Sequence, residues 1–216
     1  LYYGVHYKGK FSKTTPQTIS NLKEQNRQFV AKLKQISDKV LSRQESISKQ
    51  IMLLRLENQV SQLHYKMYMI PMNAEGGFYS GINWALRSLP FKTIENYEDY
   101  FAWLPNYVAH FEEQMELMKT GIKEGIVAPK EVIQNNLQLL APWINEDLSK
   151  NPFYAPFTNI PEDWDKKDVE RIRKEGEKII ETQVVAAYKK LHTFLSTTYL
   201  NASNENPGIK FVTNGA

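Results

Sequence analysis

Four histidines and no cysteine limit the chemistry that this chain can perform. None of the histidines has a His, Asp or Glu four residues away, the spacing that places two metal ligands on one helix face. They are His6, His64, His110 and His192. His64 follows Glu57 by seven residues, which favours a helix-surface pair over a pair of ligands. Because thiol chemistry is also excluded, we expect no catalytic residue and no metal ligand in this segment.

Three nearby aspartates, Asp163, Asp165 and Asp168, resemble the start of a calcium loop. The match fails because Lys167 stands where such a loop needs an oxygen ligand and no glycine follows. We interpret the aspartates as an acidic cap that opens the last helix. A nucleophile elbow, a phosphate-binding glycine loop and a dinucleotide fingerprint are also absent from the sequence.

Composition names no partner. Lys and Arg number 27 against 24 Asp and Glu, an excess too small and too evenly spread to predict a nucleic-acid partner. No apolar run approaches the roughly 18 residues that a membrane-spanning helix needs.

The stretch "HYKMYMIPMNAEGGFYSG", residues 64 to 81, interrupts a long helical pattern. Pro71 ends the helix, and Gly76-Gly77 permits positive φ angles or a close backbone approach in a tight turn. Asn73 and Glu75 place polar groups beside these glycines, and loops held by rigid helices often carry binding residues. The stretch is therefore either a structural corner or a ligand-facing loop.

A second stretch, "NPFYAPF" at residues 151 to 157, combines prolines with Phe153, Tyr154 and Phe157. A rigid hydrophobic corner clamped to the core is the interpretation we favour, and an aromatic subsite for a ligand is the alternative.

Helical periodicity runs from residue 16 to residue 200, and no segment shows convincing strand alternation. The sequence predicts an all-α fold, an antiparallel bundle of about five main helices, several of them long, with short connections. The first helix opens at Thr15-Pro16, and the others span about 42–70, 94–123 (capped by Thr93), 130–140 and 166–200.

The positions of apolar residues, proline and glycine within the helices lead to three further expectations about packing. The second helix needs other long helices beside it, and Ile47, Ile51 and Leu54 widen its buried stripe. Pro105 predicts a kink or a break in the third long helix. Gly176 lies on the buried side of the last helix, where we expect another helix to cross closely.

Three segments are expected along the chain. Residues 1–15 form an extended lead-in, 16–200 the helical bundle, and 201–216 a polar linker or severed edge toward a missing C-terminal domain. The first residue is Leu1 and no apolar signal segment follows it, so we expect that a part upstream is missing.

Six stretches in series resemble the N-terminal half of the bacterial domain-of-unknown-function family 885. They are "LLRLENQV" (53–60), "IPMNAEGGF" (70–78), "LPFKTIENYEDY" (89–100), "GIKEGIVAPKEVI" (121–133), "NPFYAPF" (151–157) and "VVAAYKKLHTFLSTTYL" (184–200). The resemblance covers nearly the whole chain. It implies a longer parent that often begins with an export or lipoprotein signal and is grouped with helical zinc metallopeptidases. The family's His-Glu-x-x-His-like motif lies in its C-terminal half, and nothing here matches it.

By this resemblance the segment is an N-terminal helical scaffold and substrate-cleft wall of an exported, zinc-peptidase-like protein, inactive by itself. Zinc belongs to the missing half, which is the expected partner, together with a peptide substrate. The parent is expected in the periplasm or anchored to a membrane by an upstream lipid. The candidates for contacting substrate or orienting metal ligands are Arg55, Glu57, Asn58, Asn73, Glu75, Gly76 and Gly77.

The alternative function is a non-catalytic helical module that binds another protein through an apolar groove. Its support is the stripe of aromatic and methionine side chains within residues 97 to 118.

Overall fold

The computed structural model describes residues 14–82, 86, 89–145 and 147–212. The described residues are mostly helical, as predicted, with one two-stranded antiparallel sheet of two residues a strand. The main elements are α1 (Pro16–Gln35), α2 (Arg43–His64), β1 (Met72–Asn73), β2 (Gly76–Gly77), α4 (Ile94–Glu124), α5 (Lys130–Leu139), α6 (Lys166–Ile179), α7 (Ala186–Phe194) and α8 (Leu200–Ala202).

Shorter helical turns connect these elements. The 3₁₀ turns are η1 (Asp38–Val40), η2 (Met67–Met69), η3 (Ala141–Ile144), η4 (Leu148–Lys150), η5 (Pro152–Phe157) and η8 (Ile209–Phe211). Two π-helical segments, η6 (Ile180–Val185) and η7 (Leu195–Tyr199), join α6, α7 and α8 into one continuous rod.

Local capping chemistry fixes where the long helices begin. The Thr15 side chain accepts a hydrogen bond from the Thr18 N–H, with Pro16 at the first helical position, as the sequence predicts. Thr93 caps α4 in the same way by accepting from the Asn96 N–H. Asp165 opens α6 by accepting from the Lys167 N–H, so the acidic cap is also confirmed.

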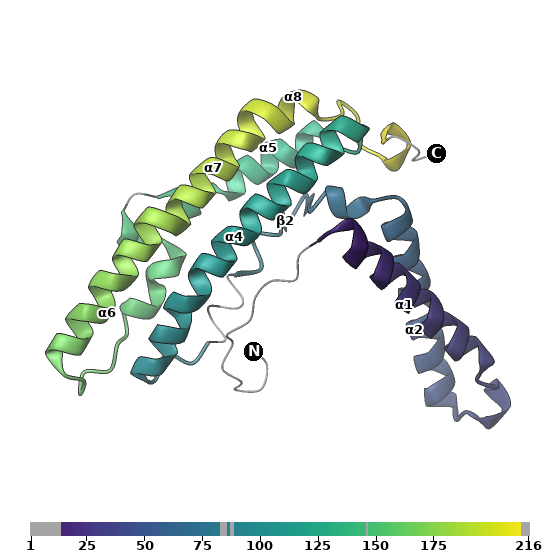
Figure 1. The fold of residues 1–216 in the computed structure, drawn as a ribbon, viewed down its shortest axis with the longest axis horizontal. Helices are drawn as coiled ribbons and strands as arrows, with labels where there is room; N and C mark the ends of the chain where they lie inside the picture. Colours follow the sequence, from purple (N-terminus) through teal and green to yellow (C-terminus); the bar gives the residue numbers. More distant parts are fainter. Residues whose placement is uncertain (1–13, 83–85, 87–88, 146, 213–216) are drawn as a thin grey trace.

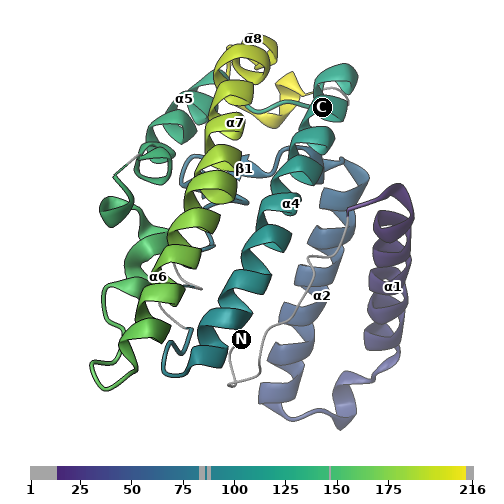
Figure 2. The same ribbon diagram turned by 60° about the vertical axis from the view of Figure 1, so that its left-hand side comes forward.

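The core lies between α4 and the rod made by α6, η6, α7 and η7, which run side by side in both ribbon views (Figures 1 and 2). It is rich in aromatic side chains, which pack edge to face or stacked. α5 and the turns η3 to η5 cover a further side of this core. In the described part of the chain, no helix is both long and apolar enough to cross a membrane.

The α1–α2 hairpin stands apart from this bundle (Figure 1), which corrects our expectation of a buried second helix. α2 packs mainly on α1 and has no fully buried residue. Ile47, Ile51 and Leu54 are exposed rather than part of a core stripe. Periodicity correctly marks the apolar side of α2, but no second layer of described residues covers it.

Two further expectations have different outcomes. α4 is assigned as one helix through Pro105, so the chain does not break there. At Gly176 a close neighbour is present, but it is the Phe157 ring of η5 rather than another helix. An added Cβ would lie 2.3 Å from Phe157 Cζ.

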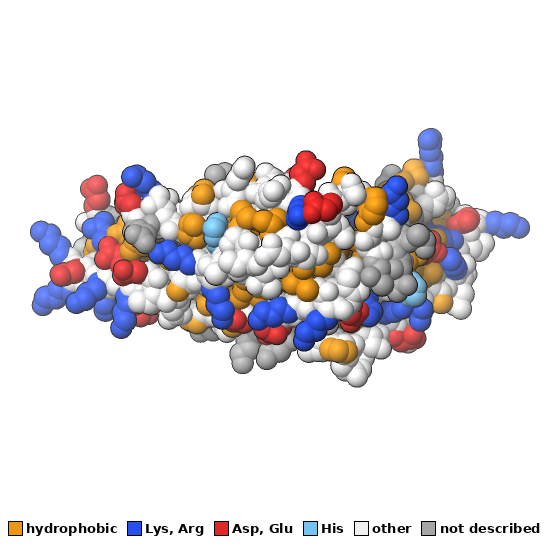
Figure 3. All heavy atoms as spheres, turned by 90° about the horizontal axis from the view of Figure 1, so that it is seen from above, with side chains coloured by type: hydrophobic (Ala, Val, Ile, Leu, Met, Phe, Trp, Pro, Cys, Tyr) orange, Lys and Arg blue, Asp and Glu red, His pale blue; other side chains and the backbone are white. Residues whose placement is uncertain are grey.

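The start of the segment predicted as a linker packs on the bundle. The Lys130 N–H donates to the Asn204 carbonyl at 2.8 Å, and Ser203 is buried. Charged side chains of both signs are scattered over the face shown in Figure 3, so this face carries no large field of one sign.

Candidate functional site

The loop that follows η2 folds into a small hairpin. Met72 pairs with Gly77 and Asn73 with Gly76, which leaves Ala74 and Glu75 at the turn. The Asn73 side-chain oxygen accepts from the Glu75 N–H at 2.8 Å. At both glycine positions a side chain would be unfavourable. Gly76 has a φ of +144°, and a Cβ on Gly77 would lie 3.0 Å from the Pro71 carbonyl oxygen.

Two asparagines of α5 hold this hairpin against the bundle. The fully buried Asn136 donates from Nδ2 to the Asn73 carbonyl at 2.8 Å and to the Val132 carbonyl at 2.7 Å. Its Oδ1 accepts from the Tyr79 hydroxyl at 2.6 Å. Asn135 donates to the Ala74 carbonyl. The turn is therefore fixed from one side by side chains about 60 residues away in sequence.

A buried pair of tyrosines fixes the end of the loop. The hydroxyls of Tyr107, from α4, and Tyr188, from α7, approach the Tyr79 carbonyl oxygen at 2.8 and 3.0 Å. These hydroxyls are also 2.8 Å from each other. Two phenolic protons thus serve three short contacts, and the loop is tied to two core helices at once.

Burial keeps these phenols protonated. It raises the pKa of Tyr79 to about 12 and raises the pKa values of Tyr107 and Tyr188 above their ordinary range. Since they remain neutral donors at ordinary pH, their role is to position the loop. Sequence reasoning missed them. The one available signal was an asparagine, Asn136, on the apolar side of a helix, where it needs a partner.

A surface hollow of about 710 Å³ opens beside the fixed loop. Four predicted site residues, Asn73, Glu75, Gly76 and Gly77, line it together. The remaining lining residues come from the end of α2, from η2 and from the same loop; they are Gln62, Met67, Ile70, Pro71, Met72 and Ser80. Glu75 is the one charged residue among these lining residues.

The candidates on α2 divide into two groups. Asn58 and Arg55 precede Gln62 by four and seven residues, so they lie on the helix face that leads to the hollow. Glu57 pairs instead with Lys34 of α1, at 2.7 Å. The three candidates are exposed, and the structure does not place their side chains in the lining of the hollow.

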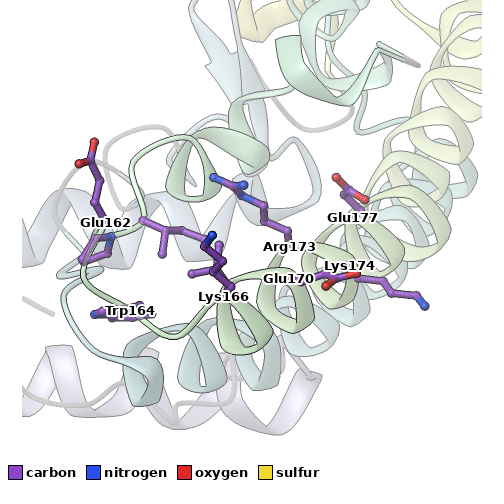
Figure 4. A pocket seen from close by; sticks show the side chains of 10 residues that line it. Glu162, Trp164, Lys166, Glu170, Arg173, Lys174 and Glu177 are labelled. Carbon is purple, nitrogen blue, oxygen red and sulfur yellow. The ribbon is translucent and has the colours of Figure 1, made fainter.

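The aromatic corner lies elsewhere. Phe153 and Phe157 are fully buried, so a ligand could touch them only if the corner opened. Tyr154 is half-buried and donates to a Glu177 carboxylate oxygen at 3.0 Å. Glu177 also lines a second hollow, of about 650 Å³, between α6 and the loop before it (Figure 4).

Charges of both signs surround this second hollow. Arg173, Lys174 and Glu177 come from α6, whereas Glu162 and Trp164 come from the preceding loop (Figure 4). No polar lining side chain there is fully buried, so the hollow has no preorganised polar contact to recognise one ligand.

Zinc, which the family resemblance implies, does not fit the described residues. Among them, no three His, Asp or Glu side chains form a group that could hold a metal ion. His64, His110 and His192 lie on three different helices, and His6 is outside the described residues. Burial lowers the pKa of His110, while Glu113, whose carboxylate is 3.9 Å away, opposes that shift.

The fold and the hollow together define the class of protein. It is an all-α scaffold that presents a polar loop, held by buried hydrogen bonds, at its surface. The chain matches the family described as "Bacterial protein of unknown function (DUF885)" over residues 1–215, and it belongs to that family. The match confirms the resemblance seen in the six stretches. No curated protein matches the chain.

Proposed function

We propose that this chain is the helical scaffold and one wall of the substrate cleft of an exported, zinc-peptidase-like protein. The reactive groups and the zinc belong to a C-terminal half of the same protein, outside these residues. The parent is exported, and is either periplasmic or held to a membrane by a lipid anchor. This chain contributes shape and substrate contacts.

The observation that carries the proposal is the fixed loop at the hollow. Its turn is held by Asn135 and Asn136 and its end by Tyr107 and Tyr188, so its polar groups lose little freedom when a ligand binds. Such preorganisation is expected of a binding surface, whereas a connecting corner needs only its glycines.

The chemistry of the lining fits a peptide. Met67, Ile70 and Met72 supply apolar surface, and the Asn73 amide nitrogen and the Glu75 carboxylate supply a donor and an acceptor. A peptide segment offers both apolar side chains and amide groups. Arg55 and Asn58 lie on the same face of α2 as Gln62, farther along the helix from the hollow, so they would extend the contact to a longer peptide.

Substitutions in the loop test the proposal. In the full-length gene product, Glu75→Ala or Asn73→Ala should lower kcat/KM on a peptide library about five- to tenfold, the loss of one hydrogen bond of about 1–1.5 kcal/mol. Glu57→Ala is the matched control because its carboxylate pairs with Lys34 away from the hollow, and it should leave kcat/KM unchanged. Unchanged turnover with Glu75→Ala, or peptide hydrolysis by this segment alone, would contradict the proposal.

The observation that favoured the alternative function, a protein-binding module, has a different explanation in the structure. The stripe that suggested an apolar groove, residues 97 to 118, is core: Tyr97, Phe101, Leu104, Phe111, Met115 and Met118 are all buried. No described surface of α4 offers these side chains to a partner.

A further inference from the structure

Exposed large apolar side chains gather on the α1–α2 hairpin rather than spreading over the protein. Of the ten among the described residues, eight lie between residues 29 and 65. They are Phe29, Ile36, Val40, Ile47, Ile51, Met52, Leu54 and Tyr65. Such clustering marks an interaction surface more often than isolated exposed residues do.

The turn of the hairpin is the most exposed part of this set. Val40, in η1, is 76% exposed, and Ile36 and Ile47, at the adjoining ends of α1 and α2, are 41% and 42% exposed. We call residues 36 to 47 the tip. The tip is the end of the hairpin farthest from the bundle (Figure 1), so nothing described stands between it and an approaching surface.

The hairpin is also basic. Residues 16 to 64 contain eight Lys or Arg and four Asp or Glu, a formal net charge of +4 in a chain whose total is +3. The element that carries the exposed apolar side chains is therefore net positive.

At the tip, the acidic groups are engaged locally. The Asp38 carboxylate pairs with Lys49 at 2.8 Å, and the Glu45 carboxylate accepts from the Ser42 N–H at 2.8 Å as part of a helix cap. Lys39 and Arg43 are exposed and form no ion pair with another described residue. Asp38 and Glu45 offset them in formal charge, so the tip itself has a net charge of zero, and the positive excess of the hairpin comes from residues that flank the tip.

We propose that the tip docks on the surface of an anionic lipid bilayer. Val40, Ile36 and Ile47 enter the region between headgroups and acyl chains, and Lys39 and Arg43 contact the lipid phosphates. Exposed aliphatic side chains at the end of a hairpin with a net charge of +4 match such a surface in polarity and in overall charge.

A second protein fits this surface less well. A stable protein interface buries about 800 Å² on each partner around a closely packed, often aromatic centre. A narrow turn with three aliphatic side chains offers neither that area nor an aromatic anchor, whereas shallow insertion into lipid needs only a few apolar residues and nearby cations.

Docking by the tip leaves the hollow in water. Gln62, at the rim of the hollow, is about 15 residues along α2 from the end of the tip at Ile47, or about 22 Å at 1.5 Å per residue. The inference therefore goes beyond the proposed function and does not depend on it.

The absence of cysteine allows a direct test. Val40→Cys and Leu139→Cys, each labelled with an environment-sensitive fluorophore, are mixed with vesicles of phosphatidylcholine alone or with added phosphatidylglycerol. Leu139 is the control because it is 39% exposed but lies on α5 in the bundle. We expect a blue shift for the label at position 40 on phosphatidylglycerol vesicles, reversed by salt, and no shift at position 139.

Vesicle co-sedimentation of unlabelled variants gives the energetic test. Lys39→Ala and Arg43→Ala should each weaken binding about fivefold, the effect of about 1 kcal/mol per cation at such a surface. Val40→Asp should weaken it tenfold or more because it removes a buried aliphatic group. Leu139→Asp should leave binding unchanged.

Three outcomes would overturn the proposal. One is equal binding to both kinds of vesicle, and another is binding that Val40→Asp does not change. The third is self-association of the chain without vesicles, seen by light scattering and abolished by Val40→Asp, which would assign the tip to a second copy of the chain.

Discussion

Asn136 is the residue whose loss should most clearly separate the fixed loop from the bundle. In Asn136→Ala, the Tyr79 hydroxyl loses its 2.6 Å acceptor and the Asn73 carbonyl loses its 2.8 Å donor. The hydroxyl is buried, and an unpaired buried group costs about 1–3 kcal/mol, while the partly accessible carbonyl costs about 1 kcal/mol. We expect the free energy of unfolding to fall by about 3 kcal/mol and Tm to fall by about 6–12 °C.

The neighbouring substitution Asn135→Ala is a matched control. Both changes replace an asparagine by alanine within α5, so both gain the same helix propensity. Asn135 loses only its bond to the Ala74 carbonyl at the surface, where water can replace it. We expect this variant to lose less than about 1 kcal/mol.

Urea unfolding followed by circular dichroism measures both variants, with equal m-values as the condition for comparison. A double-mutant cycle with Tyr79→Phe should give a coupling of about 1–2 kcal/mol between residues 79 and 136. If Asn135→Ala and Asn136→Ala are equal within about 0.5 kcal/mol, the buried network does not hold the loop and the reasoning is refuted.

Three further predictions concern the core, the pH dependence and the hairpin. Gly176→Ala should destabilise by about 1–3 kcal/mol because its Cβ would lie 2.3 Å from the Phe157 ring, whereas Gly81→Ala meets open space; equal unfolding free energies would contradict this. Burial raises the pKa values of Tyr79 and Tyr199 from 10.0 to about 12, so their protonated forms stabilise the fold. That stability is complete below pH about 10 and is lost as the pH rises toward about 12; Tyr199→Phe should flatten the fall between pH about 10 and about 12 in urea unfolding. Amide hydrogen exchange should be faster in α1 and α2 than in α4 and α7, because α2 has no fully buried residue; equal protection would show that the hairpin opens only with the core.

Helix starts and the position of the loop were accessible from sequence because their causes are local. Thr15 and Thr93 cap helices through hydrogen bonds to residues three positions away. Gly76 and Gly77 mark a tight turn because their backbone geometry requires small residues. The four loop candidates could therefore be named before their arrangement around the hollow was known.

What holds the loop was not accessible, because the contacts are distant in sequence. Tyr188 is 109 residues from Tyr79, and no pattern within one helix predicts that their hydroxyl and carbonyl groups meet. The prediction that the apolar side of α2 is buried was wrong for a related reason. Ile47, Ile51 and Leu54 have the spacing of a buried stripe, but periodicity gives the direction of a face and not what covers it.

The joint between α2 and the bundle makes the hairpin a lever arm. Lys66 turns the chain with a φ of 56° and pairs with Glu124, and Met69 lies against Gly121 in the last turn of α4. α2 has 22 residues, or about 33 Å, so a rotation of about 10° at this joint would displace the far turn by about 6 Å. Small changes in packing around Gly121 would therefore produce larger displacements of the hairpin tip. Related proteins should differ most in the angle between the hairpin and the bundle.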